Sequence, residues 1–284
     1  MEITDLTGNR KAADWIAIPR PNQQARLRLF CVPYAGAGTH AFRQWPEILP
    51  SDVEVCLVRL PGRESRLRDT PFCRITPLVE ALTQALVAYF DKPFALFGHS
   101  MGAKIIFELA NRIRSGFALE PVMLFVSGCN GPQVTRTQPP TYNLPDPEFL
   151  QTLYDLNGTP REVIENPELM QLLMPALRAD FELVQTYAYS PGLPLNCPII
   201  AFGGLEDRDV SRTSLEAWRY HTASLFSLQM FKGNHFFLHT SQAAFLESLS
   251  FHLQRVLRTT VQTKNPNGNL ERWNLPGARS GQAL

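Results

Sequence analysis

The stretch FALFGHSMGAKIIFELA, residues 94–110, sets one serine between two different apolar patterns. Residues 94–97 are continuously apolar, as in a buried parallel strand. After Ser100, the segment AKIIFELA repeats apolar residues at helical spacing. Ser100 is therefore expected in a sharp turn from a strand into a helix.

Two glycines flank this serine. Gly98 and Gly102 leave out side chains where the strand and the helix would nearly touch. In such a G-x-S-x-G elbow the serine hydroxyl stands clear of the backbone, as a nucleophile must to reach a carbonyl carbon. The alternative is an ordinary strand-to-helix turn with a serine cap.

The rest of the chain alternates short apolar runs with helical stretches. Alternation of this kind predicts a mostly parallel central sheet flanked by helices. With the elbow, it predicts an α/β fold of the α/β-hydrolase type. The apolar runs expected to form strands are residues 27–33, 53–61, 93–98, 122–128, 197–204 and 227–233.

We expect one α/β-hydrolase domain over residues 26–258, preceded by a leader, 1–25, and followed by a polar, disordered tail, 259–284. Residues 130–192 are rich in proline and in helix-start signals such as NPELMQLL. This region is predicted to form a helical lid over the site. The alternative is a pair of surface helices without a gating role.

Composition excludes several function classes. Of the 284 residues, 44% are hydrophobic, and the net charge is only +1, so neither nucleic acid nor an anionic membrane is expected as a partner. No apolar run approaches the roughly 20 residues that span a bilayer, and the first residues have no signal-like core, so we expect a cytoplasmic protein. Five cysteines without metal-like spacing predict buried, reduced thiols and no metal site.

A serine nucleophile in this fold needs an acid and then a histidine downstream, each just past a strand. His235 directly follows the strand-like SLQMFKGN, whereas His239 comes after FFL and is expected to begin the next helix. The segment after CPIIAFGG offers Glu206, Asp207 and Asp209. We favour His235 as the base and Asp207 as the group that orients the imidazole.

The oxyanion formed during acyl transfer needs N–H donors. The expected donors are the backbone N–H of Met101, just after the nucleophile, and that of Ala35 in the loop PYAGAG. Residues 36–41, GAGTHA, also fit the dinucleotide fingerprint G-x-G-x-x-A, so a nicotinamide enzyme is an alternative. That alternative explains neither GHSMG nor the downstream acid and histidine.

Read in order, GHSMGA, PYAGAG, LPGRE, GTPREV, LRADF, GGLED and GNHFFL carry a family resemblance. Over about residues 26–257 the chain resembles the stand-alone type II thioesterases of nonribosomal peptide and polyketide synthesis. The resemblance implies hydrolysis of acyl thioesters from the phosphopantetheine arm of carrier-protein domains, which removes mis-primed or stalled acyl groups, by a monomer without a cofactor. It assigns the triad to Ser100, Asp207 and His235 and the oxyanion donors to Ala35 and Met101.

Three positions depart from the usual family pattern, namely Ala37, Lys104 and Asn234. Lys104 is expected to be an exposed helix residue; the alternative places it beside the acyl channel, where it would restrict the channel. The general serine esterase or lipase and the non-catalytic binding protein on a hydrolase scaffold are the alternative functions.

One arginine-rich stretch bears on the partner. Because carrier-protein domains are usually acidic, we expect part of it to dock the carrier or its phosphate. In the alternative interpretation the stretch is a solvated loop, with Arg63 paired to Glu64 or Asp69. The docking candidates are Arg59, Arg63, Arg66 and Arg68.

Overall fold

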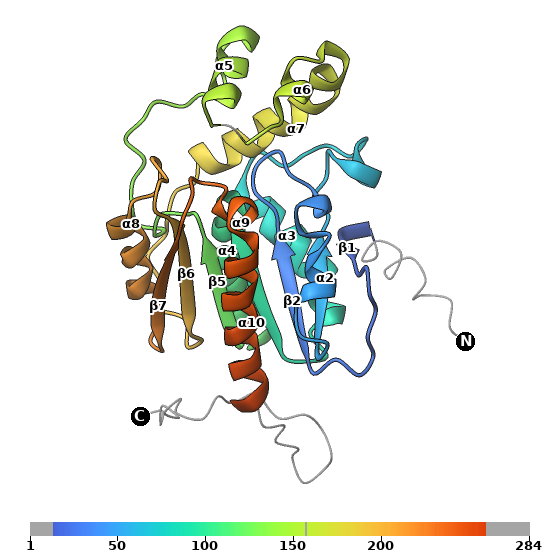
Figure 1. Cartoon of the computed structure of the whole chain (residues 1–284), viewed down its shortest axis with the longest axis vertical. Coiled ribbons are helices and arrows are strands. Elements are labelled where there is room, and N and C mark those ends of the chain that lie inside the picture. The colour runs from blue at the N-terminus through green and yellow to red at the C-terminus, as the bar shows by residue number, and fades with distance from the viewer. Residues whose placement is uncertain (1–13, 157, 260–284) are drawn as a thin grey trace, which may run out of the picture.

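The computed structural model describes residues 14–156 and 158–259 of the chain. Its centre is a seven-stranded sheet in the order β1-β3-β2-β4-β5-β6-β7 (Figure 1). All neighbouring strands are parallel except β1, which runs antiparallel to β3. The strands are β1 Ile16–Ala17, β2 Leu27–Val32, β3 Val53–Val58, β4 Phe94–His99, β5 Met123–Ser127, β6 Ile199–Gly204 and β7 Phe226–Phe231.

The connections between strands are mostly helical. All six strands expected from apolar runs are present, so the predicted α/β architecture is confirmed. The α-helices are α2 Trp45–Ile48, α3 Ile75–Leu86, α4 Met101–Phe117, α5 Asp146–Leu156, α6 Arg161–Ile164, α7 Pro167–Gln185, α8 Arg212–Glu216, α9 Phe237–Thr240 and α10 Gln242–Thr259. The 3-10 helices are η1 Thr39–Phe42, η2 Glu64–Arg66, η3 Val87–Tyr89 and η4 Ala217–His221.

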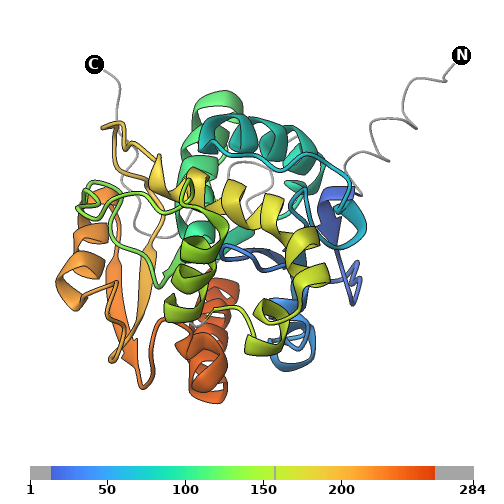
Figure 2. The ribbon, with the colours of Figure 1, turned by 90° about the horizontal axis from the view of Figure 1, so that it is seen from above.

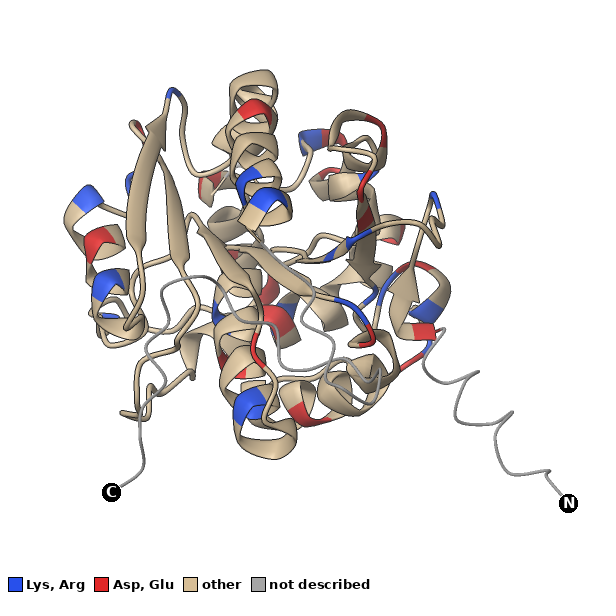
Figure 3. Cartoon of the chain, turned by 90° about the horizontal axis from the view of Figure 1, so that it is seen from below, with Lys and Arg blue, Asp and Glu red and all other residues tan. Residues whose placement is uncertain are grey.

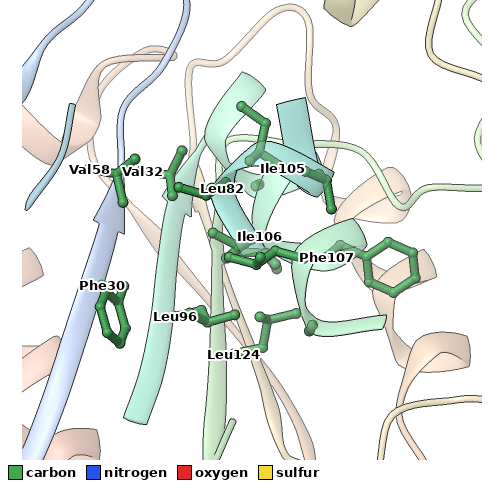
Figure 4. Packing of buried hydrophobic residues seen from close by; sticks show 14 of the residues in the cluster. Phe30, Val32, Val58, Leu82, Leu96, Ile105, Ile106, Phe107 and Leu124 are labelled. Atoms are coloured by element: carbon green, nitrogen blue, oxygen red, sulfur yellow. The ribbon is translucent and has the colours of Figure 1, made fainter. Parts of the chain in front are cut away.

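The two faces of the sheet are covered by different helices, because side chains alternate between faces along each strand. Phe30 and Leu96 point to the face covered by α3 and α4, where they pack with residues such as Leu82 and Ile106 (Figure 4). The opposite face carries Phe97, which packs with α2 and α10. The strand that leads to Ser100 is thus buried on both faces, and it lies between β2 and β5.

Helices α5, α6 and α7 form a separate layer above the sheet (Figures 1 and 2). They have a small apolar cluster of their own, which includes Phe149 of α5, Ile164 of α6 and Leu177 of α7. Helix α7 begins as the sequence predicts, since the Asn166 side chain accepts a hydrogen bond from Leu169 N. Whether this layer acts as a lid stays a prediction.

Residues 14–17 differ from the expected leader. Trp15 and Ile16 are buried, and Ile16 pairs with Val58 at the edge of the sheet. A strand of two residues is too short to show a periodic pattern, which is why the sequence did not predict it. The predicted tail, apart from its first residue, lies outside the described residues.

Two broader observations bear on partners. Basic and acidic residues are interspersed along the described ribbon (Figure 3), in keeping with a net charge of +1 for the chain. Among the described residues, none of the helices is long and apolar enough to cross a bilayer.

Candidate active site

Ser100 lies at the turn from β4 into α4 with a backbone φ of 52° and ψ of −113°. Positive φ is rare for a residue with a side chain, and its strain is typical of functional sites. The turn is held by a 2.7 Å hydrogen bond from Ser100 N to Ser127 O at the end of β5. The hydroxyl is thereby presented at the carboxyl edge of the sheet.

The flanking glycines are required by close packing. A Cβ at Gly98 would lie 2.2 Å from the carbonyl oxygen of Gly102, and a Cβ at Gly102 would lie 2.2 Å from that of Val32. Both clashes are with backbone, so a side chain could not rotate away. The elbow therefore forms because the sequence leaves these two positions empty.

Asp207 and His235 follow β6 and β7, and the structure brings them together. His235 Nδ1 lies 2.8 Å from Asp207 Oδ2, and because a carboxylate only accepts, Nδ1 is the donor. Asp207 Oδ1 also accepts from the N–H groups of Asp209 and Val210, at 3.0 and 3.1 Å. The Asp207 side chain is fully buried, whereas that of His235 is 18% exposed. Asp207 is thus fixed, and His235 is left with Nε2 for the cavity.

Ser100 and His235 line one cavity of about 970 Å³, which lies between the sheet edge and the α5–α7 layer. Its wall includes Ala35 from the loop after β2 and Phe181 from α7. Among the described residues, Ser100 Oγ makes no direct hydrogen bond to His235. Such contacts often tighten only when substrate is bound.

Of the two expected oxyanion donors, Ala35 lines the same cavity as Ser100, and Met101 directly follows Ser100 in the chain. Met101 N is at the amino end of α4, where N–H groups have no partner within the helix. Within the described part of the chain, the N–H groups of Ala35 and Met101 make no hydrogen bond.

His99, the residue before Ser100, is completely buried under the site. Its Nδ1 lies 2.9 Å from Ser127 Oγ, and its ring centroid is 5.0 Å from that of His235. Burial lowers the pKa of His99 well below its usual range, and the nearby His235 and His239 act in the same direction. His99 therefore stays neutral and serves as packing beneath His235.

An ion pair that the sequence did not predict holds the loop next to Ala35. Asp180 of α7 accepts from Arg63 Nη2 and Nη1, at 2.7 and 2.8 Å, and from Gly36 N, at 2.8 Å. Arg63 Nη1 also donates to Ala37 O, at 2.9 Å. The α5–α7 layer is thus tied to the loop that carries an oxyanion donor.

This ion pair corrects the hypothesis for Arg63. Arg63 is only 6% exposed and pairs with Asp180, so it takes no part in a docking surface and does not pair with Glu64 or Asp69. Burial works against its charge, but Asp180 outweighs that effect and raises the Arg63 pKa. Asp180 lies within the motif LRADF, but no local sequence pattern indicated that Arg63 would be its partner.

The other three docking candidates stay at or near the surface. Arg66 pairs with Asp69 at 2.8 Å, and its guanidinium carbon lies 4.0 Å from the centre of a Trp15 ring. Arg59 donates to Asp14 O, at 3.4 Å, and Arg68 is exposed. These contacts leave Arg68 as the most accessible of the four.

Lys104 lines the cavity, so the expectation of an exposed helix residue is wrong. Its ammonium lies 4.5 Å from the centre of the Tyr187 ring. The sequence pattern predicts which face of the helix carries Lys104, but it does not predict which other segment packs over that face. In the structure, the segment after α7, which includes Tyr187, packs there.

No group of three or more His, Cys, Asp or Glu that could hold a metal ion occurs in the described ranges. Four of the five cysteines are buried, and burial raises the pKa of the Cys31, Cys56, Cys129 and Cys197 thiols. These thiols are therefore packed as neutral apolar groups.

A model of the thioesterase domain matches residues 27–253. The chain belongs to the thioesterase family. The thioesterase is 44% identical over 247 residues to the gramicidin S biosynthesis protein GrsT of Aneurinibacillus migulanus, covering 87% of this chain and 96% of that protein. It is 39% identical over 260 residues to the linear gramicidin dehydrogenase LgrE of Brevibacillus parabrevis, covering 90% and 97%.

Solved structures agree with this family. The type II thioesterase BorB from the borrelidin biosynthetic cluster superposes with a TM-score of 0.78 at 36% identity, covering 84% of this chain and 97% of that chain. The resemblance to type II thioesterases and the α/β-hydrolase fold predicted from the sequence are therefore confirmed.

The name of LgrE raises the nicotinamide alternative again, and the geometry of the GAGTHA loop argues against it. A dinucleotide fingerprint needs a helix whose amino end receives the pyrophosphate. Here the loop leads into a four-residue 3-10 helix, Thr39–Phe42. Gly36 N, one of the amides that would face a phosphate, is bound to the carboxylate of Asp180.

Proposed function

We propose that this thioesterase is a type II enzyme that hydrolyses acyl groups from the phosphopantetheine arm of carrier-protein domains in a peptide or polyketide synthase. The observation that carries the proposal is the Asp207–His235 pair, 2.8 Å apart, in a cavity shared with a strained Ser100. The similarity to GrsT and to BorB supports the biosynthetic setting.

The geometry supports an acyl-enzyme mechanism. His235 Nε2 takes the proton of Ser100 as Oγ attacks the thioester carbonyl carbon, and the N–H groups of Ala35 and Met101 stabilise the oxyanion. The carbon–sulfur bond then breaks, and the leaving thiol receives that proton from His235. In the second half of the reaction His235 takes a proton from water, whose oxygen attacks the acyl carbon; the bond from that carbon to Ser100 Oγ then breaks, His235 gives the proton to Oγ, and the free acid leaves. Asp207 accepts from Nδ1–H and stabilises the imidazolium that forms.

The first test compares three substrates, namely an acetyl group on a phosphopantetheinylated carrier protein, acetyl-CoA and p-nitrophenyl acetate. We expect the highest kcat/KM for the carrier-bound thioester. Ser100→Ala should abolish turnover, and Asp207→Asn should lower kcat by about 10³- to 10⁴-fold with an unchanged melting temperature, as expected for an orienting carboxylate. Preference for the simple ester, with the carrier ignored, would make the protein a general esterase.

A further inference from the structure

Glu64 has a strained backbone. Among the described residues other than glycine, only Glu64, Ser100 and Ala118 have a positive φ, which is 52° at Glu64. Ser100 is the elbow, and Ala118 ends helix α4. Strain of this kind persists only where the surrounding contacts over-determine it, and it is typical of functional sites. The contacts of Glu64 therefore indicate what its conformation serves.

The Glu64 carboxylate binds the loop that carries Ala35. Its Oε1 accepts from Thr39 N and from Thr39 Oγ1, each at 2.8 Å. Thr39 begins η1, whose own N-terminal residue, Gly38, supplies no side-chain cap, so a distant carboxylate takes the place of the cap. A Cβ at Gly38 would lie 2.6 Å from Oε1. The carboxylate thus lies directly against the backbone of the loop.

Glu64 is charged at this contact. Burial works to raise its pKa, but the hydrogen bonds from His40 and Thr39 outweigh burial and lower the pKa. The side chain is 26% exposed, and His40 Nδ1 lies 3.8 Å from Oε1. Because an ionised acceptor makes shorter and stronger hydrogen bonds than a neutral one, the Thr39 amide is held firmly.

Arg63 and Glu64 hold the same loop at two points. Arg63 Nη1 donates to Ala37 O at 2.9 Å, two residues before the threonine that Glu64 binds. Arg63 itself is extended, with φ −151° and ψ 163°. Successive side chains of an extended chain point to opposite sides, so a second extended residue would direct its carboxylate away from the loop. The left-handed conformation of Glu64 brings both side chains to one loop.

The same loop contains the turn that orients the Ala35 N–H group. Ala37 N donates to Tyr34 O at 3.0 Å, and Gly36 has a φ of 77°. These are the features of a type II β-turn, with Ala35 and Gly36 as its central residues. Because the turn ends at Ala37 and Thr39 follows closely, fixing these two residues fixes the direction of the Ala35 N–H group.

We propose that Glu64 is a positioning residue of the reaction, which holds Thr39 so that the Ala35 N–H group faces the oxyanion. This inference rests on the proposed function, in which Ala35 N–H is an oxyanion donor. A displacement of about 1 Å can cost about 10²-fold in rate, so loss of the Glu64 contact should lower kcat by about 10- to 100-fold. Acylation and deacylation both form an oxyanion and slow alike, so KM should change less than about 3-fold.

The test measures kcat, KM and melting temperature with p-nitrophenyl acetate, an ester without a carrier, so that the nearby docking candidates play no part. Glu64→Ala keeps the strained backbone and loses the carboxylate, whereas Glu64→Gly relieves the strain and loses the carboxylate. We expect Glu64→Gly to melt at a higher temperature than Glu64→Ala, with kcat lowered equally in both. Glu64→Gln keeps the acceptor oxygen and should retain kcat within about 3-fold.

A control variant and an inhibitor make the comparison sharper. Asp69→Gly removes a carboxylate of the same stretch, which pairs with Arg66 at the surface, and should leave kcat within about 3-fold. Benzeneboronic acid forms a tetrahedral adduct with a catalytic serine and so imitates the oxyanion intermediate. Its inhibition constant should rise in Glu64→Gly by the same factor by which kcat falls.

The outcomes separate this inference from the proposed function. The role of Glu64 is refuted if kcat follows the melting temperature across the variants, if KM rises while kcat is unchanged, or if Glu64→Gln loses as much as Glu64→Gly. Wild-type kcat in Glu64→Gly refutes it as well, and in all these cases the thioesterase stands. If Ser100→Ala keeps its turnover of the ester, the proposed mechanism fails and the inference fails with it.

Discussion

Replacing Asp180 by asparagine should destabilise the thioesterase far more than an ordinary change on α7. Asp180 is 2% exposed and accepts three hydrogen bonds, two from Arg63 and one from Gly36. Asp180→Asn removes the charge and leaves the buried guanidinium without a counterion. Breaking one side of a buried ion pair costs about 3–5 kcal/mol of the free energy of unfolding.

The loss in the free energy of unfolding can be measured by urea unfolding, with a matched control variant on the same helix. Glu182 pairs with Arg74, but these side chains are 25% and 50% exposed, so Glu182→Gln should cost less than about 1 kcal/mol. For a domain of this size, the loss at Asp180 should lower the melting temperature by roughly 6–20 °C.

A double variant separates stability from activity. Arg63→Met with Asp180→Leu replaces both charges by apolar groups, which is often neutral for a buried pair. We expect stability to return to within about 2 kcal/mol of wild type, because Gly36 is exposed and its N–H can bind water instead. The loop that carries Ala35 would still lack the hydrogen bond from Gly36 N to Asp180, so the kcat of the double variant should be about 10²-fold below that of the wild type.

Two results would refute this reasoning. One is an Asp180→Asn protein no less stable than Glu182→Gln, since the buried ion pair would then stabilise the protein no more than the exposed pair does. The other is a double variant with wild-type kcat, since the ion pair would then play no part in positioning the oxyanion loop.

Two further predictions concern the elbow and acid stability. Gly102→Ala should abolish activity and lower the yield of folded protein, because the added Cβ would lie 2.2 Å from Val32 O. Gly116→Ala is the control on the same helix, since its added Cβ would have no atom within 4 Å. In thermal unfolding this control should be neutral or stabilise the protein by up to about 1 kcal/mol. Burial lowers the pKa of His221 from 6.5 to about 4, so the unfolded chain takes up this proton first as the pH falls. The stability that the neutral His221 contributes is complete above pH 6.5 and is lost as the pH falls toward 4, so the melting temperature should drop over this interval. His221→Gln should make the drop of the melting temperature with pH less steep. The same steepness in the variant and the wild type would contradict the assignment to His221.

Much of the fold could be predicted from the sequence because it is encoded locally. Short apolar runs predicted six strands, and two glycines at fixed offsets predicted the turn at Ser100. The order of strands along the chain then indicated where the acid and the histidine should follow. His235 could be chosen because it directly follows a strand-like run, whereas the same argument gave three candidates for the acid, Glu206, Asp207 and Asp209, and the family resemblance pointed to Asp207.

Tertiary structure decided the partners of the charged side chains. Arg63 was expected to help dock a carrier or, in the alternative, to pair with Glu64 or Asp69 in a solvated loop, yet its counterion is Asp180, 117 residues away. Lys104 has a helical position that the sequence gives correctly, but its place in the cavity depends on Tyr187, which follows α7. Backbone conformation is set largely by neighbouring residues, whereas burial of a charge depends on which distant segments pack over it, and a local pattern does not contain that information.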